Sequence, residues 1–130
     1  FTGDTLFVGD SGRTDLPYGH RPTLGASIRK IMELPEDTLV FAAHEYTLAN
    51  LAFARAADPD NPDVEATEAE CQRSRELDRP TLPTTLGRER RINPFLRCTS
   101  AGIRKAASAH GDTDSQLATF TTLRAWKDDF

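Results

Sequence analysis

The segment Thr38-Leu-Val-Phe-Ala-Ala-His-Glu-Tyr-Thr-Leu-Ala-Asn50 joins an apolar run to a cluster of polar, titratable side chains. The opening run is partly β-branched, which is typical of a short buried strand. A tight connection from His44 to Tyr46 follows, and Thr47 is the expected N-cap of a helix that runs past Phe53. Sheets of α/β proteins place their chemistry at such strand ends, although a purely structural histidine would give the same pattern.

The residues before this segment predict a strand, a loop and a helix in that order. Leu6-Phe-Val8 is a short apolar strand, and turn-forming residues make a surface loop over residues 9–19. Apolar residues recur at helical spacing over residues 22–34, and Pro22 suits a first turn. Together with the central segment, this order predicts an α/β arrangement in which a helix crosses between two strands.

The composition changes after Ala57, where residues 58–63 form a turn-rich break. Three further helices are predicted, over residues 64–77, 100–109 and 114–127. Asp114 is the expected cap of the last one. Prolines in residues 78–85 prevent a regular helix there and favour an extended connector. We therefore expect the second half of the chain to be mainly helical.

The composition points away from nucleic acids and membranes as partners. The 130 residues carry a net charge of -4 at pH 7, and the sequence pI is near 5.3, so an anionic partner surface is not favoured. No apolar run approaches the ~20 residues of a membrane span. The two cysteines, Cys71 and Cys98, lack CxxC spacing and are expected to be reduced thiols, so we expect a cytoplasmic protein.

Asp4 and His44 are candidate metal ligands. Gly3 frees the backbone to place the Asp4 carboxylate before the first strand, and His44 follows the central strand. These two ligand types suit a metal ion, and an Asp can bridge two ions that together activate a water and polarise a carbonyl. Two ligands cannot hold a catalytic metal, and His20 and His110 share no spacing with them. The residues therefore predict part of a metal site, and an ordinary Gly-Asp turn remains the alternative for Asp4.

Three cations are candidate contacts for an anionic ligand. Arg13 lies in the turn-rich loop, where a fixed guanidinium can hold a carboxylate through two hydrogen bonds. Arg124 and Lys127 are three residues apart on the last predicted helix, so their charges are expected side by side. Solvated surface charges are the alternative for all three.

Four segments form a more specific pattern: Phe1-Thr-Gly-Asp-Thr-Leu-Phe7, Ala43-His-Glu-Tyr-Thr47, Asn93-Pro-Phe95, and Arg124 with Lys127, Asp128 and Phe130. In this order they resemble glyoxalase II, the hydroxyacylglutathione hydrolase family of the metallo-β-lactamase superfamily. The Gly-Asp turn and the strand-end His44 alone would indicate only the superfamily. The other segments are more specific, and the resemblance covers essentially the whole chain.

The resemblance implies an α+β fold, with the C-terminal half of a metallo-β-lactamase αββα sandwich over residues 1–57 and a helical glutathione-binding domain over residues 58–130. It implies that Asp4 bridges two divalent metal ions, zinc first with iron or manganese as alternatives, and that His44 binds one of them. It also implies that four residues bind glutathione: Arg13, Tyr46, Arg124 and Lys127. The implied reaction is hydrolysis of the thioester S-D-lactoylglutathione to D-lactate and glutathione.

Two features depart from the family pattern. The THxHxDH ligand motif of the family's N-terminal half is absent, so we expect a fragment that is inactive alone and whose partner is that missing half. The complete protein is expected to be a monomer. The loop Gly12-Arg-Thr-Asp15 looks more like that of the persulfide dioxygenase branch. A persulfide dioxygenase-like enzyme and a non-catalytic glutathione-binding fragment therefore remain alternatives.

Overall fold

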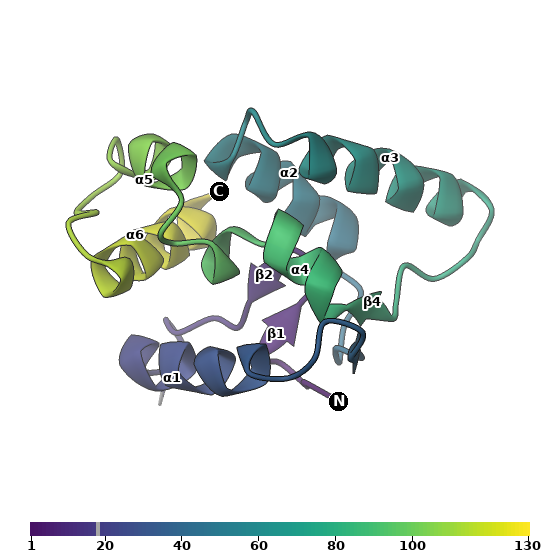
Figure 1. Ribbon diagram of the computed structural model, residues 1–130, viewed down its shortest axis with the longest axis horizontal. Helices are drawn as coiled ribbons and strands as arrows, with labels where there is room; N and C mark the ends of the chain where they lie inside the picture. The colour runs from purple at the N-terminus through teal and green to yellow at the C-terminus, as the bar shows by residue number, and fades with distance from the viewer. Residues whose placement is uncertain (18) are drawn as a thin grey trace.

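A computed structural model describes residues 1–17 and 19–130 (Figure 1). In chain order the elements are β1 (Leu6–Phe7), β2 (Asp10–Ser11), α1 (Arg21–Met32), β3 (Leu39–Val40), α2 (Thr47–Ala57), α3 (Pro62–Glu76), β4 (Thr84–Thr85), α4 (Leu86–Ile92), the 3₁₀ helix η1 (Pro94–Leu96), α5 (Ala101–Ala107) and α6 (Gln116–Asp129). Helices dominate and the strands form two small sheets, which confirms the predicted α+β composition with a helical C-terminal part. These sheets do not by themselves show an αββα sandwich.

The first sheet is a tight hairpin between α1 and α2 (Figure 1). β1 and β2 pair antiparallel, with Leu6 opposite Ser11 and Phe7 opposite Asp10. Gly9 closes the turn with a φ of +71°, a conformation that glycine adopts without steric cost. Part of the surface loop predicted over residues 9–19 is therefore a strand, and Tyr18 within that loop lies outside the described residues.

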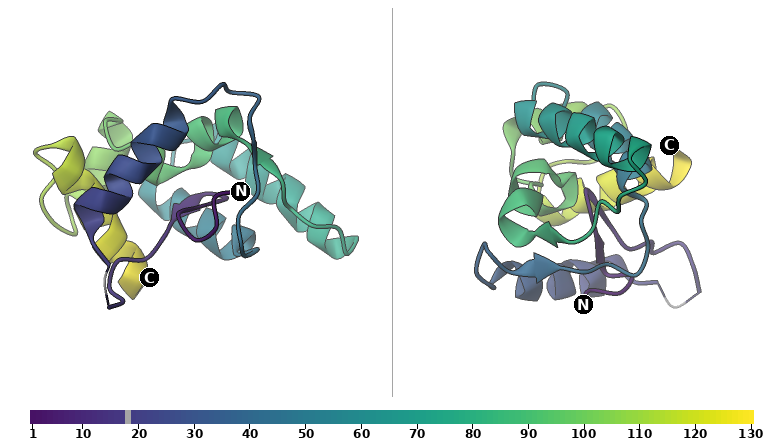
Figure 2. Two further views of the ribbon diagram at one scale, coloured as in Figure 1. Left: turned by 90° about the horizontal axis from the view of Figure 1, so that it is seen from below. Right: turned by 90° about the vertical axis from the view of Figure 1, so that its right-hand side faces the viewer.

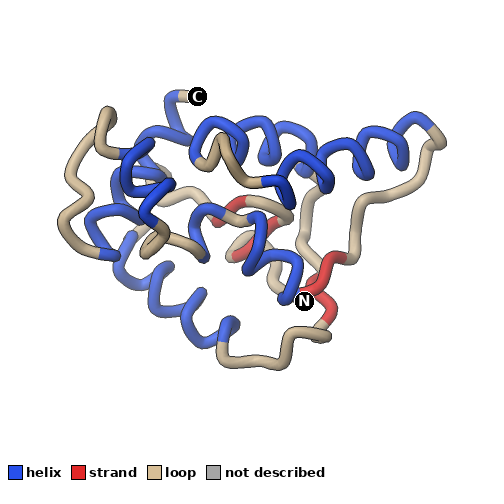
Figure 3. The backbone as a smooth tube through the Cα atoms, turned by 45° about the horizontal axis from the view of Figure 1, so that its top comes forward, coloured by secondary structure: helices blue, strands red, loops and turns tan. Residues whose placement is uncertain are grey.

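The predicted α/β arrangement is only partly present. β3 pairs antiparallel with β4, which the extended connector brings to it from the second half of the chain. An isolated parallel β-bridge between Gly3 and Ala42 joins the first segment to the central one. The expected central strand is therefore short, and Figure 3 shows only small strand segments in a mainly helical molecule.

The helices predicted from apolar spacing are present, with shifts of a few residues at their ends, but two predicted caps are wrong. Tyr46 occupies the N-cap position of α2, and the Thr47 hydroxyl instead lies 2.6 Å from that of Thr81. Ser115, not Asp114, caps α6 by accepting a hydrogen bond from the backbone of Ala118 at 3.0 Å. No helix among the described residues is both long and apolar enough to cross a membrane.

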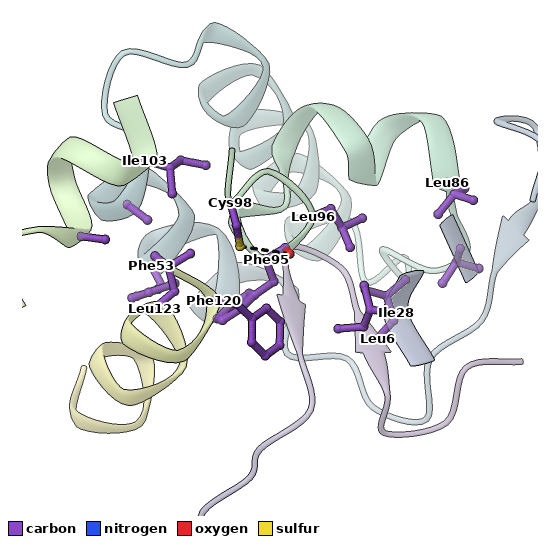
Figure 4. Packing of buried hydrophobic residues seen from close by; sticks show 13 residues of the cluster. Leu6, Ile28, Phe53, Leu86, Phe95, Leu96, Cys98, Ile103, Phe120 and Leu123 are labelled. Carbon is purple, nitrogen blue, oxygen red and sulfur yellow. Dashed lines mark hydrogen bonds between the residues drawn. The ribbon is translucent and has the colours of Figure 1, made fainter. Parts of the chain in front are cut away.

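The larger hydrophobic cluster joins the strands to the C-terminal helices. It includes Leu6 and Val40 from the strands, Phe53 from α2, Phe95 from η1 and Leu123 from α6. Figure 4 labels Leu6, Phe53, Phe95 and Leu123 among the side chains of this cluster, and the rings of Phe53 and Phe95 are 6.0 Å apart between centroids. The cluster therefore draws on residues from both sides of position 57.

A second cluster packs α2, α3 and α4 together. It consists of Val8, Leu51, Ala54, Val64, Cys71 and Ile92. The two cysteines are free and buried, Cys71 in this cluster and Cys98 in the larger one, as predicted. Burial raises the pKa of the Cys98 thiol to about 12, so this side chain behaves as an apolar core residue.

Glu89 of α4 is a fully buried acid that joins three segments. Its Oε2 accepts hydrogen bonds from the Gly9 backbone at 2.9 Å and from Asn93 Nδ2 at 3.0 Å. Its Oε1 accepts one from the Thr84 hydroxyl at 3.0 Å. Burial raises the pKa of Glu89 from 4.5 to about 7, and the three hydrogen bonds limit the rise. Between about pH 4.5 and about pH 7, Glu89 therefore holds a proton in the folded protein that the unfolded chain has already released.

We expect Glu89→Gln to stabilise the protein at about pH 8 and to change its stability little at about pH 5. Because the pKa of Glu89 is raised in the folded state, the free energy of unfolding falls as the pH rises from about 4.5 through about 7. A glutamine amide can keep all three hydrogen bonds without a charge. Chemical denaturation at the two pH values measures the difference, which is at most about 3 kcal/mol.

The matched control is Glu33→Gln, which neutralises an exposed acid at the end of α1 and should show no such pH-dependent gain. Parallel stability curves for the native chain and Glu89→Gln between these pH values would contradict the expectation.

Candidate functional site

A cavity of about 470 Å³ lies between the hairpin, the connection before α2 and the last turns of α6. All six residues predicted as site residues line it: Asp4, Arg13, His44, Tyr46, Arg124 and Lys127. Figure 2 shows α6 in yellow approaching the purple N-terminal segments from the other end of the chain. The fold, not local spacing, therefore brings these residues together.

Asp4 and His44 lie side by side, with His44 Nε2 3.4 Å from Asp4 Oδ1. Two backbone hydrogen bonds hold their turns together. The Ala43 N–H donates to the Gly3 carbonyl at 3.0 Å, and the Thr2 N–H donates to the Phe41 carbonyl at 2.9 Å. Gly3 has a φ of +52°, which explains why a glycine precedes the aspartate. The side chains of Asp4 and His44 are 71% and 52% exposed, so both are open to a ligand from solvent.

These two side chains fit part of a metal centre and not a complete one. A carboxylate oxygen and an imidazole nitrogen are suitable ligands for zinc-type ions. Within residues 1–17 and 19–130, however, no group of three or more His, Cys, Asp or Glu side chains is arranged to hold a metal. His20 instead accepts a hydrogen bond from the Thr23 backbone at the start of α1, and His110 stacks on Trp126 with centroids 3.8 Å apart.

Tyr46 forms an aromatic wall of the cavity with two neighbours. Its ring stacks on that of His44 with centroids 5.2 Å apart, and Phe7 lies 5.6 Å from Tyr46. Phe7 is buried, whereas Tyr46 is 52% exposed. The wall therefore offers an apolar face to a ligand, and the Tyr46 hydroxyl can exchange hydrogen bonds with it.

Arg124 is 2% exposed, which excludes the solvated-surface alternative for this residue. Its Nη1 donates to Asp10 Oδ1 at 2.9 Å and to the Ser11 carbonyl at 2.8 Å. Its Nε donates to Asp128 Oδ1 at 3.1 Å, and Nη2 lies 2.9 Å from the same oxygen. All three nitrogens of the guanidinium are therefore engaged with the protein itself, and Arg124 ties α6 to the hairpin.

Lys127 and Arg13 are the more accessible cations. Lys127 is half-buried with Nζ 5.6 Å from the Phe53 ring centroid, and no acidic side chain in the described part of the chain forms a salt bridge with it. Arg13 donates to Asp15 from Nε at 2.9 Å and from Nη2 at 2.5 Å, which holds the pKa of Asp15 below its usual range. A ligand carboxylate can reach Arg13 at the guanidinium donors that Asp15 does not use, and it can approach Lys127 directly.

Seven further lining residues were not predicted as site residues from the sequence: Phe7, Asp10, Ser11, Leu16, Ala49, Asn50 and Asp128. Asp128 follows Arg124 by four residues on α6, so the helical spacing was an available signal for that pair. Asp10 is 114 residues away from Arg124 along the chain, and no local pattern indicates it. Burial raises the pKa of Asp10, and the charge of Arg124 offsets part of that rise.

The structure is a mainly helical module with a cavity that is lined by cations and an aromatic wall. Residues 45–130 match the family described as "Hydroxyacylglutathione hydrolase C-terminus". The chain belongs to this family, which confirms the family resemblance inferred from its sequence motifs.

Proteins named hydroxyacylglutathione hydrolase are similar to this chain over its whole length. The one from Chromohalobacter salexigens is 55% identical over 130 residues, that from Aliivibrio salmonicida 45% over 130, and that from Cupriavidus taiwanensis 47% over 131. These alignments cover 50%, 51% and 48% of the three relatives. The chain therefore spans about half the length of the curated relatives it matches.

We expect Arg124→Ala to lower the free energy of unfolding by about 3–5 kcal/mol, because the Asp10 carboxylate would stay buried without its ionic partner. Urea denaturation measures the loss. Lys127→Ala, a cation three residues away without such a partner, is the control and should cost less than about 1 kcal/mol. Equal losses in the two variants would show that the ion pair does not hold α6 on the hairpin.

Proposed function

We propose that this chain supplies the glutathione-binding part of a hydroxyacylglutathione hydrolase, an enzyme that cleaves the thioester of S-D-lactoylglutathione to D-lactate and glutathione. The observation that carries the proposal is that all six residues to which the family resemblance gives a role line one cavity. Membership of the family and the named relatives support the same activity.

The chemistry of glutathione suits the cavity. Glutathione carries two carboxylates on a flexible peptide, and cations with a tyrosine hydroxyl are fitting partners for them. In this proposal Lys127 contacts one carboxylate directly, Arg13 contacts the other with the donors that Asp15 does not use, and Tyr46 hydrogen-bonds the peptide. Arg124 contributes its positive charge from behind the cavity wall, since its donors already have partners.

We further propose that Asp4 and His44 are ligands of a divalent metal centre, with Asp4 bridging two ions. Zinc is the first candidate, with iron or manganese as alternatives. Two donors do not complete such a centre, so the reaction step itself depends on donors outside these 130 residues. Residues 1–57 would then belong to the metallo-β-lactamase αββα sandwich and residues 58–130 to the helical domain that covers the substrate. A cytoplasmic location is part of the same proposal.

The glutathione part of this proposal can be tested on the chain itself. Isothermal titration calorimetry should detect binding of glutathione, and Lys127→Ala should weaken it about tenfold or more, because a charge-assisted contact is lost. Lys105→Ala removes the same charge from an exposed position on α5 and should leave the affinity unchanged. Equal affinities of the native chain and Lys127→Ala would place the ligand elsewhere.

The catalytic part requires a complete fold. We would join this chain to the portion of the Chromohalobacter salexigens relative that it does not cover and assay the chimera with S-D-lactoylglutathione. We expect thioester hydrolysis, and a loss of at least about 100-fold on His44→Ala, since even residues that only orient metal ligands cost 10–100-fold. His20→Ser, which keeps a capping side chain at the start of α1, should retain the chimera's turnover.

The same chimera separates the two alternatives. Oxygen consumption with glutathione persulfide, without thioester turnover, would identify a persulfide dioxygenase-like enzyme instead. Glutathione binding with neither reaction would favour a non-catalytic binding module.

A further inference from the structure

Asp10 places a negative charge in the wall of the cavity. Three of the residues predicted to bind a ligand there are cations. The carboxylate is 7% exposed and its Oδ1 accepts from Arg124 Nη1 at 2.9 Å and from the Ser11 backbone at 2.8 Å. A buried acid that faces an anion site needs an explanation, because it repels the ligand that the site is proposed to bind.

The geometry explains what this acid does to Arg124. A guanidinium binds a ligand carboxylate best when two of its donors on one edge are free. In this protein Asp128 takes Nε and Nη2, and Asp10 together with the Ser11 carbonyl takes Nη1. Two carboxylates of the protein itself, Asp10 and Asp128, therefore balance the charge of Arg124 before any ligand binds.

Lys127 is in the opposite position. It stands three residues further along α6, lines the same cavity, and forms no salt bridge among residues 1–17 and 19–130. Its ammonium stands over the Phe53 ring, and no carboxylate among the described residues lies within salt-bridge distance of it, although its charge acts on Asp10 at longer range. Of the two cations on α6, it is the one that can accept a new carboxylate without breaking an existing contact.

We propose that Asp10 is a specificity-determining residue of this cavity: by holding the Arg124 guanidinium, it directs a bound carboxylate to Lys127 and keeps the affinity of the cavity for anions low. This inference rests on the proposed function, because it takes glutathione as the ligand. A ligand carboxylate in the cavity therefore faces two cations of α6 that differ. Lys127 has no salt-bridge partner among the described residues, whereas the charge of Arg124 is balanced by Asp10 and Asp128.

The test is Asp10→Asn, in which the amide oxygen can still accept from Arg124 and Ser11, so that the shape of the site is kept while one negative charge is removed. We expect glutathione to bind the variant about fivefold more tightly by isothermal titration calorimetry at low salt, and the gain to shrink at high salt. The second probe is glutathione dimethyl ester, whose carboxylates are blocked so that only its ammonium is charged, and it should gain no affinity in the variant. A change in shape alone would alter the binding of both probes.

Asp37→Asn is the matched control, because it makes the same change in net charge at an exposed position that does not line the cavity. It should leave both affinities unchanged. If Asp10→Asn does not fold, as judged by its thermal unfolding, Asp10→Ser removes the same charge and keeps a hydroxyl acceptor, and the same gain is expected.

The outcomes are distinct. Tighter glutathione binding without a gain for the ester supports the role of Asp10. Glutathione binding that is equal or weaker in the variant, or a gain shared by the ester, refutes this role and leaves the proposed function standing. No glutathione binding by the native chain or any variant refutes the proposed function and this inference with it.

Discussion

The β1–β2 hairpin has strands of only two residues, and a ribbon of that size is not stable by itself. Side chains from four separate segments supply the missing partners of its peptide groups: Asn50 bonds to Val8, Glu89 to Gly9, Asn93 to Phe7 and Asp10, and Arg124 to Ser11. Leaving any of these buried groups without a partner would cost its full desolvation penalty. The hairpin and the helices around it therefore form only together.

The same constraint shapes the candidate site. The turn with Asp4 precedes the hairpin directly, and the cavity uses Phe7 and Asp10 of the two strands as part of its wall. Arg124 holds the hairpin from one side and lines the cavity on the other. Contacts that stabilise the fold and contacts that receive a ligand are thus made by one set of residues, so changes of charge there affect both properties.

The sequence predicted the elements that depend on local pattern. Apolar spacing located α1, α2, α3, α5 and α6 but not the short α4. The positions of Asp4 and His44 beside short strands indicated that they could meet. The sequence did not reveal contacts that join distant residues, such as Asp10 with Arg124 or Glu89 with Gly9. A buried acid looks like any surface acid in a sequence, because its partners come from segments that only tertiary packing brings close. Cap positions also failed by one residue, since several polar residues compete at each helix start.

Arg124 and Lys127 show how burial assigns different roles to equal charges. They lie on one helix within a single turn, and a pattern of helical spacing treats them alike. Packing of α6 against the hairpin buries Arg124 between Asp10 and Asp128. Removing Arg124 would leave the Asp10 carboxylate buried without an ionic partner. Lys127 stays half-buried over an aromatic ring and forms no salt bridge among the described residues, although its charge acts on Asp10 at longer range. A cation of this cavity is therefore available to a ligand only where it does not already form salt bridges that stabilise the fold.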